Sequence, residues 1–105
     1  MPLFDLEGSS TSQNRKTSVT RVSKSASTLP VALLSANENR VGATIFNRSS
    51  SILYLDFAEQ LSPEDFAVEV PPGGYFETPF SPVTGMWGRW RSSNGKALIR
   101  DFVEV

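Results

Sequence analysis

Among the ionisable side chains of this sequence, the carboxylates are the plentiful candidates for chemistry. Four of them lie close together in the chain, at Asp56, Glu59, Glu64 and Asp65. A glycosidase needs two carboxylates across a substrate cleft, and a calcium loop needs oxygen ligands at the spacing D-x-[DN]-x-[DN]-G. Neither pattern is present in the sequence. We therefore interpret this group as a solvated turn in which Ser62 caps a single helical turn at most.

The residue types in this sequence do not indicate nucleophilic catalysis or metal binding. The sequence has no histidine and no cysteine, which removes the commonest general base, the commonest metal ligand and all disulfides. Serines are numerous, but no G-x-S-x-G elbow and no G-x-x-x-x-G-K-[ST] phosphate loop is present. We expect a protein that is not an enzyme, with no catalytic residue, no cofactor and no metal.

Aromatic and arginine side chains form the strongest candidate for binding. Tyr75, Trp87 and Trp90 fall in one third of the chain, together with Arg89 and Arg91. Such a platform can stack sugars or nucleobases. The two tryptophans are three residues apart, however, and this spacing places them on opposite faces of a strand. We therefore favour one tryptophan in the core and one at an interface over a ligand platform.

Length and charge restrict the remaining classes of protein. A chain of 105 residues predicts one domain, and a net charge of −1 argues against a general attraction to duplex nucleic acid. No apolar run approaches the roughly 20 residues that cross a membrane. The N-terminus lacks the basic and apolar regions of a secretory signal, so we expect synthesis in the cytosol without a membrane partner.

The first 28 residues predict an extended or disordered arm. Residues 7–28 are rich in Ser and Thr and hold almost no apolar side chains, so alone they cannot offset the entropy of ordering. The alternation in "TSVTRVS" could offer Val19 and Val22 to the strand edge of a neighbouring subunit. Leu3, Phe4 and Leu6 would give such an arm an apolar tip. The alternative is a tail without a partner.

Residues 29–105 predict a small all-β domain. Turn signals recur about every 8–12 residues between segments rich in β-branched and aromatic side chains. We expect an antiparallel β-sandwich or barrel of about five to seven strands. Because the body is small and lacks disulfides, further stability from a homo-oligomer is expected.

The stretch "GATIFNRSSSILYLDF", residues 42–57, predicts a hairpin with its turn at residues 47–51. The turn is longer than the two residues that best join paired strands, so we expect Arg48 to be an interface anchor. Apolar side chains on both faces of residues 52–57 indicate a strand that is covered on both sides, or one with a face buried in an interface. Asn94 and Gly95 predict a second hairpin, with a type I′ turn.

The body resembles a group of small β-sandwich structural proteins of tailed-phage virions. That group reads L-L-x-A-N-x-x-R-x-G-x-x-I-x-N, then L-Y, then P-G-x-Y-x-E-x-P, then G-x-W-x-S-x-x-G-x-A. The matching residues are Leu33, Leu34, Ala36, Asn37, Arg40, Gly42, Ile45, Asn47, Leu53, Tyr54, Pro72, Gly73, Tyr75, Glu77, Pro79, Gly88, Trp90, Gly95 and Ala97. The match excludes the first 28 residues, and Arg91 and the stretch "PFSPVTGMW" depart from it.

The resemblance implies a non-enzymatic virion component, assembled in the host cytoplasm, with other capsid or tail proteins as partners. Our first hypothesis is a protein that decorates or cements the capsid through subunit contacts and the N-terminal arm. The alternative is a neck, tail or baseplate accessory module that binds a carbohydrate or receptor through the aromatic and arginine side chains.

Overall fold

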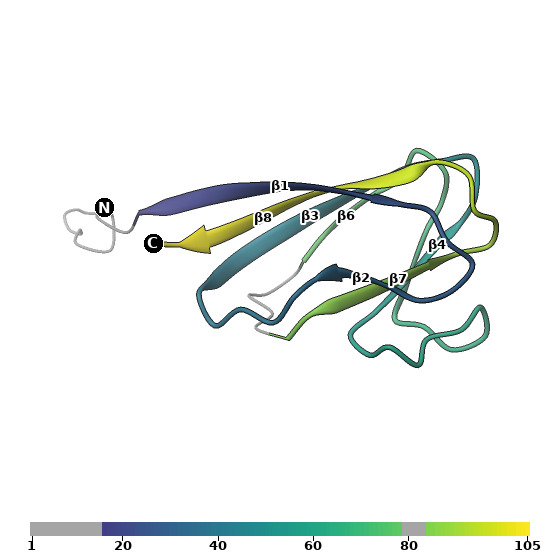
Figure 1. Cartoon of the computed structure of the whole chain (residues 1–105), viewed down its shortest axis with the longest axis horizontal. Coiled ribbons are helices and arrows are strands. Elements are labelled where there is room, and N and C mark those ends of the chain that lie inside the picture. The colour runs from purple at the N-terminus through teal and green to yellow at the C-terminus, as the bar shows by residue number, and fades with distance from the viewer. Residues whose placement is uncertain (1–15, 79–83) are drawn as a thin grey trace, which may run out of the picture.

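Segments in which β-branched and aromatic residues alternate with polar ones form the strands of this chain. The computed structural model describes residues 16–78 and 84–105 and has no helix in these ranges. The strands are β1 (Thr17–Ser25), β2 (Val31–Leu34), β3 (Arg40–Arg48), β4 (Leu53–Asp56), β5 (Val68–Val70), β6 (Tyr75–Glu77), β7 (Met86–Trp90) and β8 (Lys96–Glu104). They pack as two layers (Figure 1).

Both layers are antiparallel sheets of four strands, in the orders β1-β8-β3-β6 and β2-β7-β4-β5. Only β4 and β5 are neighbours both in sequence and in a sheet, so every other connection crosses from one layer to the other. Eight strands wrapped in this way form a jelly roll. The expected all-β sandwich is confirmed. The described residues form eight strands rather than five to seven, chiefly because residues of the predicted arm form β1.

The structure moves the boundary of the predicted arm. β1 pairs with β8 of the same chain over its whole length, from Thr17 opposite Glu104 to Ser25 opposite Lys96. Val22 packs against the core from this strand. Pairing within the chain satisfies the edge of β8 without the entropy cost of binding a second molecule. Residues 16–28 therefore belong to the sandwich in this structure.

The core lies between the two sheets. Its buried residues are Leu33, Leu34, Ala43, Ile45, Leu53, Leu55, Val70, Met86, Trp90, Ala97 and Ile99. Tyr54 points to the other side of β4 and is nevertheless only 2 % exposed, because the ring of Phe66 lies 4.7 Å from its own ring. The segment between β4 and β5 thus covers the outer side of β4 at Tyr54. Burial on both sides is found for residues 53–55, whereas Ile52, Asp56 and Phe57 are half-buried.

Neither predicted hairpin forms. β3 and β4 belong to different sheets, and β4 pairs with β5 and β7 instead of β3. β7 and β8, on either side of Gly95, are likewise in different sheets. A polar turn between two strands serves a hairpin and an inter-sheet connection equally well. The long turn at residues 47–51 is explained here by the gap that it spans, since packed sheets lie about 10 Å apart.

A reverse turn replaces the expected helical turn at Ser62. The backbone N–H of Ser62 donates to the carbonyl of Asp65 at 2.9 Å, and the N–H of Asp65 donates back at 3.1 Å. Pro63 and Glu64 form the tip. The short run between apolar strands leaves no apolar helical face, so nothing would hold a helix in place.

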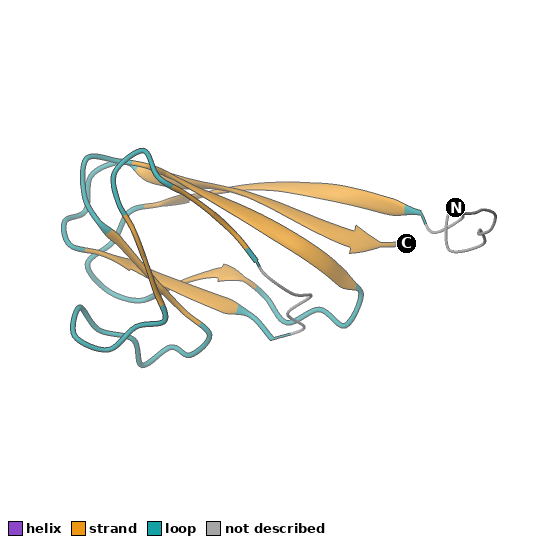
Figure 2. Ribbon diagram, turned by 180° about the vertical axis from the view of Figure 1, so that it is seen from behind, coloured by secondary structure: helices purple, strands orange, loops and turns teal. Residues whose placement is uncertain are grey.

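The two sheets differ in length. β1, β3 and β8 have nine residues each, whereas the strands of the second sheet have three to five. Figure 2 shows that the longer strands extend past the second sheet toward the ends of the chain. The β1-β8-β3-β6 sheet therefore presents a wide outer face that no other described element covers.

Candidate interaction surface

The structure divides the aromatic and arginine side chains among three places. Trp90 is 1 % exposed and lies between the sheets. Trp87 and Arg89 lie on the outer side of the second sheet, alternating with the buried Gly88 and Trp90. Tyr75 is 60 % exposed at the edge of the first sheet. The five residues do not form one platform, and the assignment of one tryptophan to the core matches the burial.

Arg91 follows Trp90 and contacts the second sheet. Its Nη2 donates to the hydroxyl of Tyr54 at 2.9 Å, and its backbone N–H donates to the carbonyl of Ile52 at 3.0 Å. Beside it, the Nε of Arg89 is buried without a hydrogen-bond partner. Arg91 thus ties the end of β7 to the start of β4.

The remaining candidates from the N-terminal region have mixed placements. Val19 is 49 % exposed on the outer face of the first sheet, whereas Val22 points inward. Leu3, Phe4 and Leu6 lie outside the described residues. Of all the predicted interface residues, the outer face of the first sheet brings together Val19, Arg48 and Tyr75.

A hydrogen-bonded network around Asn47 fixes the end of the sandwich where the inter-sheet connections meet. Asn47 is fully buried, and its Nδ2 donates to the carbonyls of Ser51 (2.8 Å), Val70 (3.0 Å) and Pro71 (3.1 Å). Its Oδ1 accepts from Nε1 of Trp90 at 3.2 Å. A side chain that meets both its donor and acceptor needs in the interior specifies one arrangement of the connections.

The same network reaches the backbone of a tight turn at residues 71–74. The N–H of Asn47 donates to the carbonyl of Gly74 at 2.9 Å, and the N–H of Gly73 donates to the carbonyl of Asn47 at 2.8 Å. Gly73 has a φ of 74°, as the third residue of a type II turn requires. The shape of this end is therefore set by hydrogen bonds that join residues far apart in the sequence.

A buried ion pair fixes the other half of the sandwich. Arg40 is 2 % exposed and donates from Nε to Oδ1 of Asp101 at 2.7 Å and from Nη2 to Oδ2 at 3.0 Å. Its guanidinium also donates to the carbonyls of Ser35 (2.6 Å) and Thr84 (3.2 Å). This bidentate geometry orients the guanidinium and satisfies it, so the pair is structural and not free to react.

The outer face of the first sheet carries rows of side chains defined by the strand register. One row holds Arg21 opposite Arg100, and another holds Arg48 opposite Lys96. Like charges directly opposite each other on a sheet destabilise it. No ion pair joins these four cations to an acid among residues 16–78 and 84–105. The sheet therefore holds two unrelieved cation pairs on its outer face.

An apolar row separates the two cation pairs. Leu98 lies opposite Phe46, and Phe46 lies opposite Tyr75. Phe46 is 36 % exposed. Val19 and Phe102 form a further apolar row beyond the Arg21 row. Alternating apolar and cationic rows on an uncovered sheet are suited to a partner with apolar and acidic side chains.

Tyr75 pairs with Glu77 on the same strand. Desolvation, the hydrogen bond from its hydroxyl to Glu77 at 3.1 Å and the negative charge of Glu77 together raise the pKa of the Tyr75 hydroxyl above its usual value. The hydroxyl therefore stays protonated and remains a donor near neutral pH. No acid-base role follows from such a shift.

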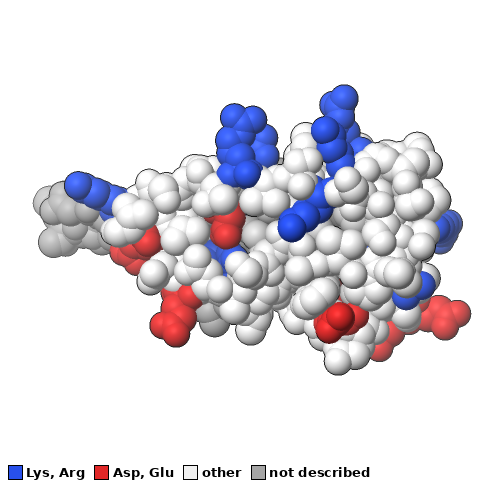
Figure 3. Space-filling view, in the orientation of Figure 1, with Lys and Arg blue, Asp and Glu red and all other residues white. Residues whose placement is uncertain are grey.

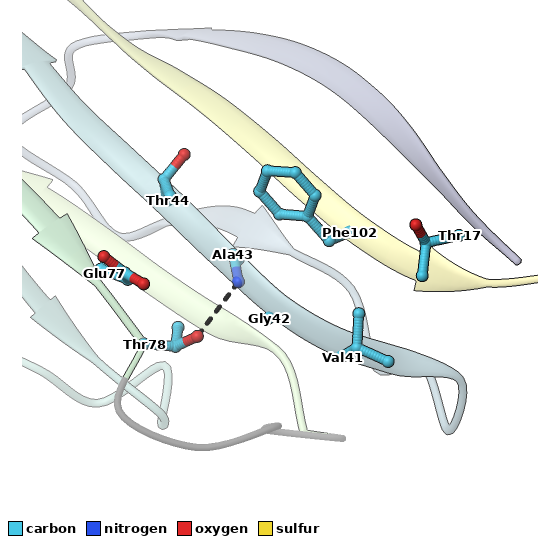
Figure 4. A pocket seen from close by; sticks show the side chains of 8 residues that line it. All are labelled: Thr17, Val41, Gly42, Ala43, Thr44, Glu77, Thr78 and Phe102. Carbon is cyan, nitrogen blue, oxygen red and sulfur yellow. Dashed lines mark hydrogen bonds between the residues drawn. The ribbon is translucent and has the colours of Figure 1, made fainter. Parts of the chain in front are cut away.

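The same face contains a hollow of about 250 Å³ between β3, β6 and β8. Figure 4 shows the ring of Phe102 beside it, with Val41 and Thr17 toward one end, and the hydroxyl of Thr78 accepting from the N–H of Ala43 at 3.0 Å. The hollow is open because Gly42, opposite Phe102, has no side chain. Among the described residues that line the hollow, Glu77 is the only ionisable one, so these residues supply no pair of acid and base groups.

Within residues 16–78 and 84–105, no group of three or more Asp or Glu side chains is placed to hold a metal ion. The same ranges contain no helix that is long and apolar enough to cross a membrane.

Comparison of the chain with protein-family models, with curated proteins and with solved structures finds no match.

Sequence reasoning missed most of the outer face of the first sheet. Arg21, Lys96 and Arg100 were not expected to act together, because they come from the two ends of the chain. Their common feature in the sequence is only the alternation of polar residues within each strand. The pairing of β1 with β8 is what brings them into register.

Proposed function

We propose that this chain is a non-enzymatic structural protein that decorates or cements the capsid of a tailed phage. The observation that carries the proposal is the uncovered outer face of the β1-β8-β3-β6 sheet, with its unrelieved cation pairs and exposed aromatic side chains. Such a face becomes more stable when an acidic and apolar partner covers it. The sequence resemblance to small virion proteins is the reason for proposing a phage capsid as the assembly to which this face binds.

The fold supports this proposal only by analogy. Jelly rolls recur in viral capsid and lectin domains, but one fold hosts many functions. The structure adds a more specific argument, since the ionisable side chains described serve packing, turns or surface charge. Arg40 and Asp101 neutralise each other, and the hollow of Figure 4 has one carboxylate.

Electron microscopy of purified phage particles with a label on this chain tests the proposal. Many labelled positions over the head are expected. Labels at the neck, tail or baseplate would replace the capsid role with the accessory role, and particles without label would overturn both.

A test of the predicted arm must remove fewer residues than 1–28, because residues 17–25 form a strand of the sandwich. Removal of residues 1–15 tests the arm alone. We expect the truncated chain to keep its melting temperature and to lose occupancy on particles, because the apolar tip of Leu3, Phe4 and Leu6 is removed. Unchanged occupancy would show that this segment plays no part in attachment.

A glycan- or receptor-binding role remains the second candidate because Trp87 is only partly buried on the outer side of the second sheet. Asp56 lies opposite it in the β4–β7 pair. An aromatic ring beside a carboxylate can bind a sugar. Loss of glycan-array binding in Trp87→Ala, with the fold intact, would support this role. Trp90→Ala is unsuitable for this test because Trp90 is in the core.

A further inference from the structure

We propose that the outer face of the β1-β8-β3-β6 sheet binds the acidic segment 57–69 of a second copy of this chain, in a head-to-tail arrangement. This inference deepens the proposed function by naming a partner for the face. In the proposed capsid assembly, neighbouring copies of this protein would then bind each other through this contact. Three properties of the two surfaces carry it.

The first property is the charge of the outer face of the β1-β8-β3-β6 sheet, which we call the basic face. Arg21, Arg48 and Lys96 are exposed, Arg100 is half-buried, and none has an acidic partner among the described residues. The two cation pairs are four residue positions apart along β8, which is about 14 Å at roughly 3.4 Å per residue. An acidic surface that spans this distance would relieve both pairs at once.

The second property is the charge of the segment between β4 and β5, together with the residue beside it on β5. Glu59, Glu64, Asp65 and Glu69 are all exposed, and no basic side chain of the described residues pairs with them. This acidic segment therefore offers four negative charges to the four cations of the basic face, which also carries the acids Glu77 and Glu104. The complementarity is present within one sequence whose net charge is −1.

The third property is position. The basic face belongs to one sheet, and the acidic segment covers the outer side of the other, as the Tyr54–Phe66 contact shows. Figure 3 shows Lys and Arg projecting from the upper side, where β1 and β8 lie, and most of the visible Asp and Glu in the lower half, with further Lys and Arg at the two ends. Surfaces on opposite sides of one molecule cannot bind each other within it, so their contact links one copy to the next.

The apolar parts of the two surfaces also correspond. The row of Leu98, Phe46 and Tyr75 runs between the cation pairs. The acidic segment exposes Ala58, Pro63 and Ala67 between its carboxylates. Small apolar side chains and a proline can lie against an aromatic row, and this would supply the desolvated centre that an interface needs.

Two double variants separate the surfaces. Arg21→Glu with Lys96→Glu alters the basic face, and Glu59→Lys with Glu64→Lys alters the acidic segment. All four positions are exposed. The basic-face variant replaces both like-charge pairs by opposite-charge pairs, so its monomer should melt at an unchanged or higher temperature. Lost association in this variant would then not be a result of unfolding.

Sedimentation velocity of the full chain at about 0.05 M salt measures association, and a repeat at about 0.5 M salt screens the charges. The wild-type chain should form species larger than a dimer at low salt and dissociate at high salt. Each double variant alone should be monomeric. Lys16→Glu and Glu38→Lys, single reversals at exposed positions away from both surfaces, should associate as the wild type does.

Mixing the two variants gives the decisive result. The basic-face variant keeps its acidic segment, and the other variant keeps its basic face, so an equimolar mixture should associate again although neither variant does so alone. A symmetric contact between identical surfaces would give no such complementation.

A wild-type chain that stays monomeric at low salt overturns the inference, as does association that both double variants retain. If the monomeric chain still labels phage particles, the proposed function stands and the basic face serves another acidic partner. A basic face that binds single-stranded nucleic acid, with the chain monomeric, would also overturn it.

Discussion

Asn47 is expected to be the most sensitive polar position in this protein. Its side chain makes five hydrogen bonds, of which those to the carbonyls of Ser51 and Val70 and from Nε1 of Trp90 are buried. In Asn47→Ala the two carbonyls lose a donor, at about 1 kcal/mol each. The indole N–H loses its acceptor inside the core, which costs about 1–3 kcal/mol more.

The expected loss is therefore about 3–5 kcal/mol of unfolding free energy, a large part of the roughly 5–15 kcal/mol that holds a small domain together. Urea denaturation followed by tryptophan fluorescence measures it, since Trp90 reports directly on the site. Ser50→Ala is the matched control, because Ser50 is exposed and its hydroxyl makes one hydrogen bond, to Asn94 at 3.0 Å. Its expected effect is below about 0.5 kcal/mol.

A double-mutant cycle with Trp90→Phe isolates the bond between the two side chains. Phenylalanine keeps an aromatic ring in the core and lacks the N–H. The two substitutions should be non-additive, with a coupling of about 1 kcal/mol or more, because either one removes the same bond. Additive effects, or a loss below about 1 kcal/mol in Asn47→Ala, would refute the role assigned to this network.

Three further predictions concern the ion pair, a glycine and the opening turn. Asp101→Ala should lower the unfolding free energy by about 3–5 kcal/mol because it leaves the buried guanidinium of Arg40 unpaired, whereas Arg40→Met combined with Asp101→Leu should recover most of this loss in urea denaturation. Gly95→Ala should lower the melting temperature more than Gly73→Ala. Both glycines have positive φ, but a Cβ at Gly95 would lie 2.6 Å from the carbonyl oxygen of Arg48, whereas a Cβ at Gly73 would meet nothing within 4 Å. Equal losses would contradict this reasoning. Arg48→Ala should change the unfolding free energy by less than about 0.5 kcal/mol and lower occupancy on phage particles; unchanged occupancy would make this residue an ordinary surface cation.

Local patterns predicted the fold class because they report on single strands and turns. Pro30 favours an edge strand, and β2 is an edge of its sheet. Gly73 and Gly95 occupy the positive-φ positions that their sequence context suggests. The spacing of Trp87 and Trp90 indicates opposite faces, and the burial pattern of β7 shows this. Each inference needs only a few consecutive residues.

Such local patterns could not predict which strands pair with each other when they are far apart in the sequence. The turns at residues 47–51 and 92–95 predict hairpins, yet both cross between sheets, since the choice depends on which strand each segment pairs with. The arm predicted for residues 1–28 contains β1 for the same reason. The few apolar residues of β1 did not indicate burial in the sequence. In the structure, β1 pairs with the edge of β8.

The sequence by itself determined that this protein is a small sandwich of strands without histidine or cysteine chemistry, because composition and alternation act over a few residues. Only the tertiary structure decided which residues form its surfaces. The cation pairs of the basic face join residues that are far apart in the sequence, Arg21 with Arg100 and Arg48 with Lys96, and the acidic segment lies on the opposite side. Strand register sets both, and register depends on contacts between distant segments of the chain.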